Sequence, residues 1–322
     1  MKIINPYNGN LLRLDNDSLI DEFGVSAFPK INGVFRIVKQ DNYANNFGFQ
    51  WNKFQKTQID RENEGFSVSK VRFFAETNWD PELLKECNIL EVGCGAGRFS
   101  QVVLFNTNAN LYSIDLSNAV EANYRNNKKY KDRIKIFQAS IYEMPFENNS
   151  FNKVFCLGVL QHTPNFKKSI KSLADKVKDG GELVVDFYPV SGWWTKINAK
   201  YILRPWLKKI EHKKLLSLIE KNVDWLIAFY LFNQKVGLGK FFNRFLPIPD
   251  ISSTIPKNLS SDELRNWVIL DTFDMFSPEY DNPQIVEQVK KWIKDAGLKV
   301  TFADYVYYGN SKAAVIRANK IL

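Results

Sequence analysis

The segment Ile89–Ser100, with the sequence ILEVGCGAGRFS, constrains the fold of this chain more than any other stretch. It joins an apolar strand to a helix start through three glycines at alternate positions, and the acid Glu91 stands near the end of the strand. Glycines let a turn approach a ligand closely, and a helix N-terminus offers unpaired N–H groups. The segment therefore predicts a site for a small polar ligand at the end of a strand.

Five apolar strands alternate with amphipathic helices around this segment, and a further helix, Pro283–Gly297, precedes two final strands. The alternation predicts an α/β fold with a doubly wound, Rossmann-like, seven-stranded sheet. The expected strands are Asn88–Val92, Asn110–Asp115, Ile134–Gln138, Lys153–Leu157, Glu182–Phe187, Leu298–Tyr305 and Ala313–Arg317.

The chain divides into five predicted parts. A β-rich module of short apolar runs and polar turns occupies 1–40, and a linker with lid helices occupies 41–87. The ligand-binding core spans 88–188, and 283–322 completes it with the last helix and two strands. The connection 189–282 is too long for a loop and must contain helices of its own. It is predicted to be an inserted, mostly helical cap that holds the acceptor.

Composition narrows the class of protein. The chain has 322 residues, of which 45% are hydrophobic, so it can bury a sizeable core. No apolar run reaches the roughly 18 to 20 residues that span a bilayer, and the first residues lack the regions of a signal peptide, which favours a cytoplasmic protein. Three scattered cysteines and two histidines predict neither a disulfide framework nor a metal site. The net charge of +9 favours an anionic partner: a phosphorylated small molecule, a nucleic acid or a membrane surface.

Further motifs follow the glycine-rich segment in a fixed order. Asp115 ends the next expected strand, eighteen positions after Gly97, where a carboxylate can accept both hydroxyls of a ribose. The stretch QASIYEMPF begins at Gln138, and the stretch FCLGVLQHTPN contains His162. Together these motifs resemble the class I S-adenosylmethionine (SAM)-dependent methyltransferases, in their small-molecule methyltransferase family, over roughly Glu76–Phe187.

The resemblance implies that the chain binds SAM and releases S-adenosylhomocysteine. Glu91, which would repel the pyrophosphate of a dinucleotide, is implied to pair with the cationic amino group of the donor. Asp115 is implied to bind the ribose, and Ser140 the adenine edge, where the family usually has Asp; a hydroxyl accepts that hydrogen bond more weakly. The implied donor-binding residues are Glu91, Gly93, Cys94, Gly95, Gly97, Asp115, Leu116, Ser140, Ile141 and Leu157.

The first residues resemble the N-terminal extension of many bacterial methyltransferases, a small zinc-ribbon-like module in which paired cysteines often hold zinc. Asn5 and Asn8 stand about where the first cysteine pair would be, so we expect zinc binding to be lost. The FGFQW stretch from Phe47, the DTFDM stretch from Asp271 and the long cap together resemble a methyltransferase subgroup that is encoded among bacterial surface-polysaccharide genes.

Three residues are candidates for catalysis. His162 follows the fourth strand, at the edge where open α/β sheets bind ligands, and a neutral imidazole there could deprotonate an acceptor hydroxyl or amine. Asp271 and Asp274 lie towards the end of the cap and could bind the acceptor or share the base role. The alternatives are structural: His162 could order its loop or touch the donor, and the cap acids could cap helices and turns.

The cap combines basic and aromatic residues, namely Trp193, Trp194, Arg204, Trp206, Lys208, Lys209, Lys213 and Lys214. Such a face could rest on lipid headgroups beside a lipid-linked acceptor, bind RNA, or simply be a solvated helix face. Three functions stay open: a methyltransferase for the O or N atom of a small-molecule or saccharide acceptor, an rRNA or tRNA base methyltransferase, and a non-catalytic SAM-binding partner subunit. The missing cysteines count against the RNA enzyme, and the intact glycine-rich segment against the non-catalytic subunit.

Overall fold

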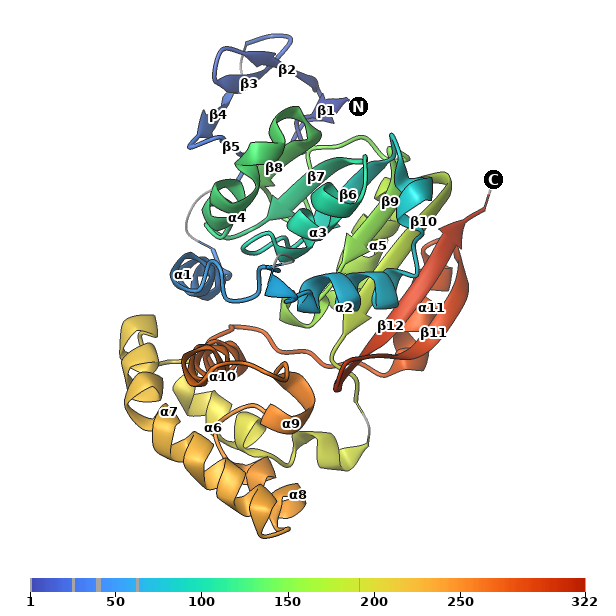
Figure 1. The fold of residues 1–322 in the computed structure, drawn as a ribbon. Helices are drawn as coiled ribbons and strands as arrows, with labels where there is room; N and C mark the ends of the chain where they lie inside the picture. The colour runs from blue at the N-terminus through green and yellow to red at the C-terminus, as the bar shows by residue number, and fades with distance from the viewer. Residues whose placement is uncertain (1, 25–26, 39–41, 62–63, 191, 322) are drawn as a thin grey trace. The chain divides into compact units, whose positions relative to one another are not determined.

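The computed structural model describes residues 2–24, 27–38, 42–61, 64–190 and 192–321. Their contacts divide the chain into two compact units. The first unit contains a β-sheet with helices, and the second is mostly helical (Figure 1). The first comprises Met1–Pro189, Tyr280–Val306 and Ala313–Leu322, and the second comprises Val190–Glu279 and Tyr307–Lys312.

The sheet of the first unit has the strand order β1-β2-β3-β4-β5-β8-β7-β6-β9-β10-β12-β11 within the described residues. β8, β7, β6, β9 and β10 run parallel, and β12 runs antiparallel to β10. This order confirms the predicted doubly wound α/β fold. The strands are β6 (Asn88–Val92), β7 (Asn110–Asp115), β8 (Ile134–Gln138), β9 (Phe151–Cys156), β10 (Val177–Phe187), β11 (Leu298–Tyr308) and β12 (Ser311–Lys320).

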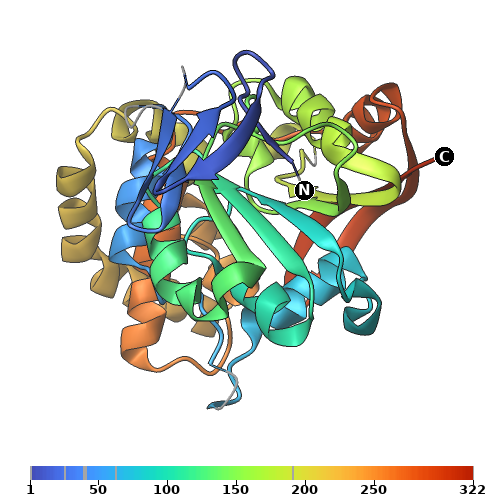
Figure 2. The ribbon, with the colours of Figure 1, turned by 90° about the horizontal axis from the view of Figure 1, so that it is seen from above.

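Helices cover both faces of this sheet (Figure 2). One layer contains α1 (Asn45–Lys53), α2 (Val68–Thr77), α3 (Arg98–Asn106) and α4 (Val120–Asn127), which contact one another in the order α1, α4, α3, α2. The other layer contains α5 (Phe166–Lys176) and α11 (Val286–Asp295). Short 3₁₀ turns at Pro81–Leu84, Lys128–Arg133 and Leu160–His162 join these elements.

The N-terminal strands extend the sheet, so it is longer than the seven strands predicted. They are β1 (Ile3–Ile4), β2 (Leu11–Asp15), β3 (Ser18–Asp21), β4 (Ala27–Ile31) and β5 (Val34–Arg36). β5 pairs in parallel with β8, and the rings of Phe35 and Phe137 stack with centroids 5.2 Å apart. The sequence suggested a separate module because its turns are short and polar, whereas the apolar pair Val34 and Phe35 is buried against the central sheet.

The first turn of the chain is held by asparagine side chains. Asn5 is buried, and its Oδ1 accepts a hydrogen bond from the N–H of Tyr7 at 3.0 Å. Asn8 Oδ1 accepts one from the N–H of Asn10, also at 3.0 Å. Such local bonds close a turn without a metal. In the part of the chain that the structure describes, no group of three or more metal-ligating side chains gathers. The loss of zinc binding stays a prediction.

The second unit contains five helices within its described residues: α6 (Ala199–Leu207), α7 (His212–Lys235), α8 (Gly239–Phe242), α9 (Ile251–Thr254) and α10 (Ser261–Phe276). Short 3₁₀ turns lie at Trp193–Lys196 and Asn243–Phe245. α10 begins with a capping box, in which Ser260 and Glu263 satisfy each other's backbone N–H groups. Among the described residues, no helix is both long and apolar enough to cross a membrane.

The predicted basic and aromatic face of this unit is only partly a surface. Arg204 is buried and donates to the carbonyl oxygen of Pro278 at 2.6 Å. Lys208 pairs with Glu279 at 3.1 Å, whereas Trp206 is 67% exposed. The side chains of Trp193 and Trp194 lie outside the described residues. The exposed aromatic surface lies mainly farther along the chain, on α7 and α8.

Candidate functional site

The glycine-rich loop between β6 and α3 adopts a backbone that other residues would strain. Gly93, Gly95 and Gly97 have φ angles of +81°, +50° and +82°. A Cβ at Gly93 would lie 2.2 Å from Val159 Cγ2, and one at Gly97 would lie 2.3 Å from Asn123 Oδ1. The three positions therefore require glycine, for conformation and for space.

Asp115 ties this loop to the end of β7. Its Oδ2 accepts a hydrogen bond from the N–H of Gly95 at 2.9 Å. Its Oδ1 accepts from the N–H and the hydroxyl of Ser117, at 2.8 and 2.7 Å. Burial raises the pKa of Asp115, and the hydrogen bonds from Ser117 and Gly95 oppose that rise. The carboxylate thus lies at the C-terminal ends of β6 and β7, where open α/β sheets bind ligands.

Glu91 lies inside the unit, with 2% of its surface exposed. Its carboxylate accepts hydrogen bonds from the hydroxyls of Ser100 on α3 and Ser113 on β7, the latter at 2.7 Å. Burial raises the pKa of Glu91 from 4.5 to about 7. In this arrangement the side chain holds the first turn of α3 against β7. The pairing of Glu91 with the amino group of the donor stays a prediction.

This pKa makes the stability of the protein depend on pH. The folded protein binds the Glu91 proton more tightly than the unfolded chain does, so stability falls as pH rises from 4.5 to about 7. Glu91→Gln cannot ionise, and we expect it to gain stability relative to the wild type across that interval, by at most about 3 kcal/mol. Urea unfolding at several pH values measures the difference. If the difference in unfolding free energy between Glu91→Gln and the wild type stayed constant from pH 4.5 to 7, the raised pKa of Glu91 would be contradicted.

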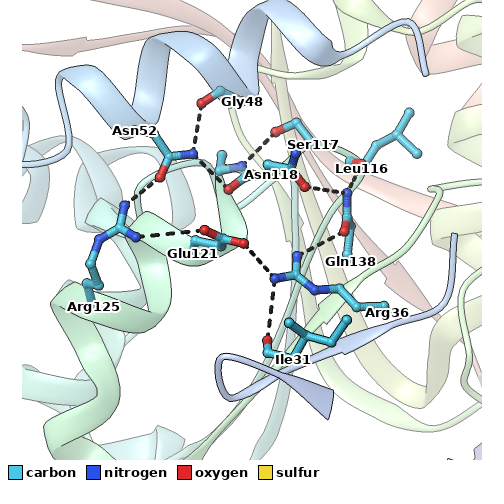
Figure 3. A network of polar contacts seen from close by, with 11 residues as sticks. Ile31, Arg36, Gly48, Asn52, Leu116, Ser117, Asn118, Glu121, Arg125 and Gln138 are labelled. Atoms are coloured by element: carbon cyan, nitrogen blue, oxygen red, sulfur yellow. Dashed lines mark hydrogen bonds and ion pairs between the residues drawn. The ribbon is translucent and has the colours of Figure 1, made fainter. Parts of the chain in front are cut away.

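A helix that the sequence analysis placed in the linker covers the loops after β6 and β7 (Figure 3). Asn52 on α1 donates to the carbonyl oxygen of Asn118 at 2.9 Å, and a Cβ at Gly48 would lie 3.1 Å from the backbone nitrogen of the same residue. Trp51 Nε1 would lie 3.2 Å from a Cβ at Gly95. Ahead of the helix, Asn42 donates to the carbonyl oxygen of Leu116 at 3.1 Å. The aromatic stretch from Phe47 was the available signal, but it carried no spacing that points to a ligand.

The N-terminal strands also support this site (Figure 3). Arg36 on β5 donates to Gln138 Oε1 at 2.9 Å and to Glu121 Oε1 at 2.8 Å. Gln138 in turn donates to the carbonyl oxygen of Leu116 at 3.1 Å. The loop that carries Leu116 and Asn118 is therefore bonded by Gln138 on β8 and Asn52 on α1, and Arg36 on β5 holds Gln138 in place.

The remaining predicted donor residues line the ends of neighbouring strands. Ser140 and Ile141 follow β8, and both are buried. The hydroxyl of Ser140 accepts from the N–H of Tyr142 at 3.2 Å, which closes a turn. Leu157 follows β9 and is buried, as is Cys94 in the glycine-rich loop, where burial raises the pKa of the thiol.

A charged group missed by the sequence analysis lies at the ends of β9 and β10. Arg72 on α2 pairs with Asp186 at 2.5 Å and with Glu76 at 2.7 Å. The N–H of Gly158 donates to Asp186, and a Cβ at Gly158 would lie 3.9 Å from Arg72 Nη2. Burial raises the pKa of Glu76 to about 7, although Arg72 opposes the rise. No spacing in the sequence connects a helix residue so far upstream with these strands.

His162 lies among aromatic side chains of the first unit. Its Nδ1 is 3.0 Å from the carbonyl oxygen of Tyr280. Ring centroids of Phe47 and Tyr188 lie 5.1 and 5.7 Å from that of the imidazole. Tyr280 also contacts Tyr43 edge-to-face, with centroids 5.4 Å apart. Burial and the nearby phenols and Asp115 raise the pKa of Tyr43.

The two predicted cap acids belong to the other unit. Asp271 and Asp274 stand within α10, three residues apart, in the last turns of this helix before Pro278. Their part in catalysis stays a prediction.

Comparisons with known proteins identify a methyltransferase domain in the chain. Residues 90–185 match the family model described as a methyltransferase domain. An uncharacterized protein of Synechococcus is 25% identical over 65% of this chain, which spans only 46% of that protein. The tRNA U34 carboxymethyltransferase of Helicobacter acinonychis is 29% identical over 69% of this chain and 82% of its own length. A magnesium protoporphyrin IX methyltransferase from Synechocystis, solved with S-adenosylhomocysteine bound, aligns over 86% of this chain and 96% of its own, with 15% identity and a TM-score of 0.46.

The matched segment begins in β6 and ends in β10, so it includes the glycine-rich loop, Asp115 and the turn after β8. These are the motifs on which the resemblance to class I methyltransferases was based, and that prediction is confirmed. Residues 90–185 therefore form a methyltransferase domain, for which SAM is the methyl donor.

Proposed function

We propose that the protein transfers the methyl group of SAM to an O or N atom of a small-molecule or saccharide acceptor. The observation that carries the proposal is the bond between Asp115 and the N–H of Gly95, which joins a strand-end carboxylate to the glycine-rich loop. This pair of elements offers acceptors for ribose hydroxyls and backbone N–H groups for the methionine end in one place.

The other residues around the loop complete a donor site. Asp115 would accept the ribose hydroxyls, while Leu116, Ser140 and Ile141 would contact adenine. Gly93, Cys94, Gly97 and Leu157 would lie along the methionine end. Arg72, through its ion pairs with Glu76 and Asp186, would position the loop after β9 beside that end. Glu91 would act mainly by positioning α3, since its buried carboxylate bonds Ser100 on α3 to Ser113 on β7.

His162 is the proposed base for the acceptor. A backbone carbonyl only accepts hydrogen bonds, so the bond to Tyr280 places the ring proton on Nδ1 and the lone pair of the neutral ring on Nε2. A lone pair there could take the proton of a hydroxyl as it attacks the methyl group. The surrounding rings of Phe47 and Tyr188 are suited to the apolar face of an organic acceptor.

The helical segment 189–282 is the proposed acceptor cap, with Asp271 and Asp274 as its polar contacts. A tRNA base is the second candidate acceptor, because the Helicobacter acinonychis relative is a tRNA U34 carboxymethyltransferase and aligns over most of its own length. The net charge of +9 also suits RNA.

Methyl-labelled SAM separates these candidates. The purified protein is incubated with labelled SAM and, in parallel, with saccharides, small hydroxyl or amine compounds, and unmodified tRNA. We expect label in the first two classes and none in tRNA. Label in tRNA alone would replace the proposed acceptor with RNA, and no label with any of them would count against a catalytic chain.

A further inference from the structure

The long helix of the second unit presents an apolar stripe to solvent. On α7, five large apolar side chains are between 45% and 58% exposed, namely Leu218, Trp225, Phe229, Phe232 and Val236. They are spaced by seven, four, three and four residues, which places them on one face of an α-helix. The side chains that α7 buries form a second stripe, made of Leu215, Ile219, Val223, Leu226 and Tyr230. The helix therefore has one apolar face in the core and another that is uncovered.

After α7 the chain continues into the short helix α8 and the 3₁₀ turn that follows it (Figure 1). Leu238, Phe241, Phe242 and Phe245 are all more than 40% exposed. Phe241 contacts the rings of Phe242 and Phe245, with centroids 5.3 and 5.9 Å apart. We call these nine residues the α7–α8 face. An exposed apolar cluster of this size on one region marks a contact surface.

The same segment carries most of the net positive charge of the chain. Residues 196–245 contain eleven Lys and Arg but three acidic residues, in a chain whose net charge is +9. Lys214 and Lys221 precede Leu218 and Trp225 by four residues, so they lie on the exposed stripe itself. Of the acidic residues, Asp224 is paired with Arg265 at 2.9 Å and Glu211 with Lys214 at 3.4 Å. The apolar face is thus set in basic surroundings.

We propose that the α7–α8 face binds the surface of a bilayer that contains anionic phospholipids. Helices that lie in a membrane interface combine Trp, Phe and Leu on one face with Lys and Arg beside it, and bind by apolar burial together with attraction to anionic headgroups. Two copies of this face would repel each other through their like charges. Single-stranded RNA binds proteins partly by stacking its bases on aromatic rings, and the aliphatic side chains of Leu218, Val236 and Leu238 cannot form such stacks.

This inference is independent of the methyl acceptor. Binding at the bilayer surface would present the methyltransferase domain to acceptors that reside in the membrane, but the face would bind vesicles whatever the acceptor is. A test on vesicles therefore succeeds or fails separately from the test with labelled SAM.

Flotation of the full chain with vesicles tests the proposal. The probes are vesicles of phosphatidylcholine alone and of an equimolar mixture of phosphatidylglycerol and phosphatidylcholine. The face variant is Phe232→Ser with Phe241→Ser, two residues that are 58% and 66% exposed. The matched control is Phe105→Ser with Leu83→Ser, which are 56% and 76% exposed on the first unit. Since these side chains are exposed, the variants should fold, and circular dichroism checks that they do.

We expect the wild type and the control to float with the phosphatidylglycerol vesicles and not with phosphatidylcholine alone. The face variant should bind at least about tenfold more weakly, because each phenylalanine loses apolar burial in the interface. Lys221→Glu with Lys235→Glu should also weaken binding to the phosphatidylglycerol vesicles at low salt, because both charges would then repel the anionic headgroups. Wild type that fails to float, or a face variant that floats as well as the control, would overturn the proposal. The proposal would also be overturned if the wild type were a dimer that only the face variant dissociates, because the α7–α8 face would then bind a second copy of the chain.

Discussion

Replacing His162 by alanine is expected to slow methyl transfer to a hydroxyl acceptor by about 10²- to 10⁴-fold, the range that general bases supply, and to leave SAM binding nearly intact. The sulfonium leaving group is already activated, so the enzyme needs only to align the nucleophile and to remove its proton. Single-turnover transfer from labelled SAM to an acceptor found in the screen measures the rate, and calorimetry measures donor binding.

The other histidine of the chain is the matched control. His212 lies on α7, with its ring centroid 6.0 Å from that of Phe273 on α10, and His212→Ala should slow methyl transfer far less than His162→Ala does. Asp271→Asn and Asp274→Asn should raise the KM for the acceptor. If His162→Ala keeps full turnover while either cap variant loses it, the base lies in the cap. If His162→Ala, Asp271→Asn and Asp274→Asn all stay active, the acceptor is a nucleophile that needs no base, such as a thiolate.

Asp115→Ala is expected to weaken SAM and S-adenosylhomocysteine binding by about 10- to 100-fold, since leaving hydrogen-bonding groups unpaired in a buried site costs about 1 to 3 kcal/mol. The substitution removes the acceptor for the ribose hydroxyls and also frees the N–H groups of Gly95 and Ser117. The wild type should bind both ligands with low micromolar affinity or better, a range typical of substrate sites. Titration calorimetry measures both proteins.

Asp132→Ala, at an exposed acid in the turn before β8, controls for the loss of one negative charge. It should bind SAM as tightly as the wild type. Tight binding by Asp115→Ala as well would show that the donor site lies elsewhere on the molecule.

Much of the parallel sheet could be predicted from the sequence, because its strands are apolar runs between polar turns. β6, β7 and β8 begin and end at the residues expected. β10 begins at Val177, five residues before the expected start at Glu182. Its first part contains the polar stretch KDGG, and a search for apolar runs does not identify such a stretch as a strand. The sheet's extension through β5 depends on the pairing of Phe35 with Phe137, a contact over a hundred residues apart in sequence.

The candidate site divides in the same way. The glycines and Asp115 form a local pattern with fixed spacing, and the structure places them together. The supports at Arg36, Asn52 and Arg72 come from elements that precede β6, and no local pattern connects them with the loops they contact. The predicted pairing of Glu91 with the amino group of the donor followed from its place beside the glycines. Its hydrogen bonds with Ser100 and Ser113 could not be predicted in this way, because they depend on how α3 packs on β7.

A crystal structure with S-adenosylhomocysteine bound tests the central claim most directly. We expect the ribose hydroxyls within hydrogen-bonding distance of Asp115, the methionine end along Gly93–Gly97, and the adenine beside Leu116 and Ile141. The sulfur should then point towards His162. A ligand bound at another place, or one whose adenine lies along the glycine-rich loop, would contradict the assignment of this site.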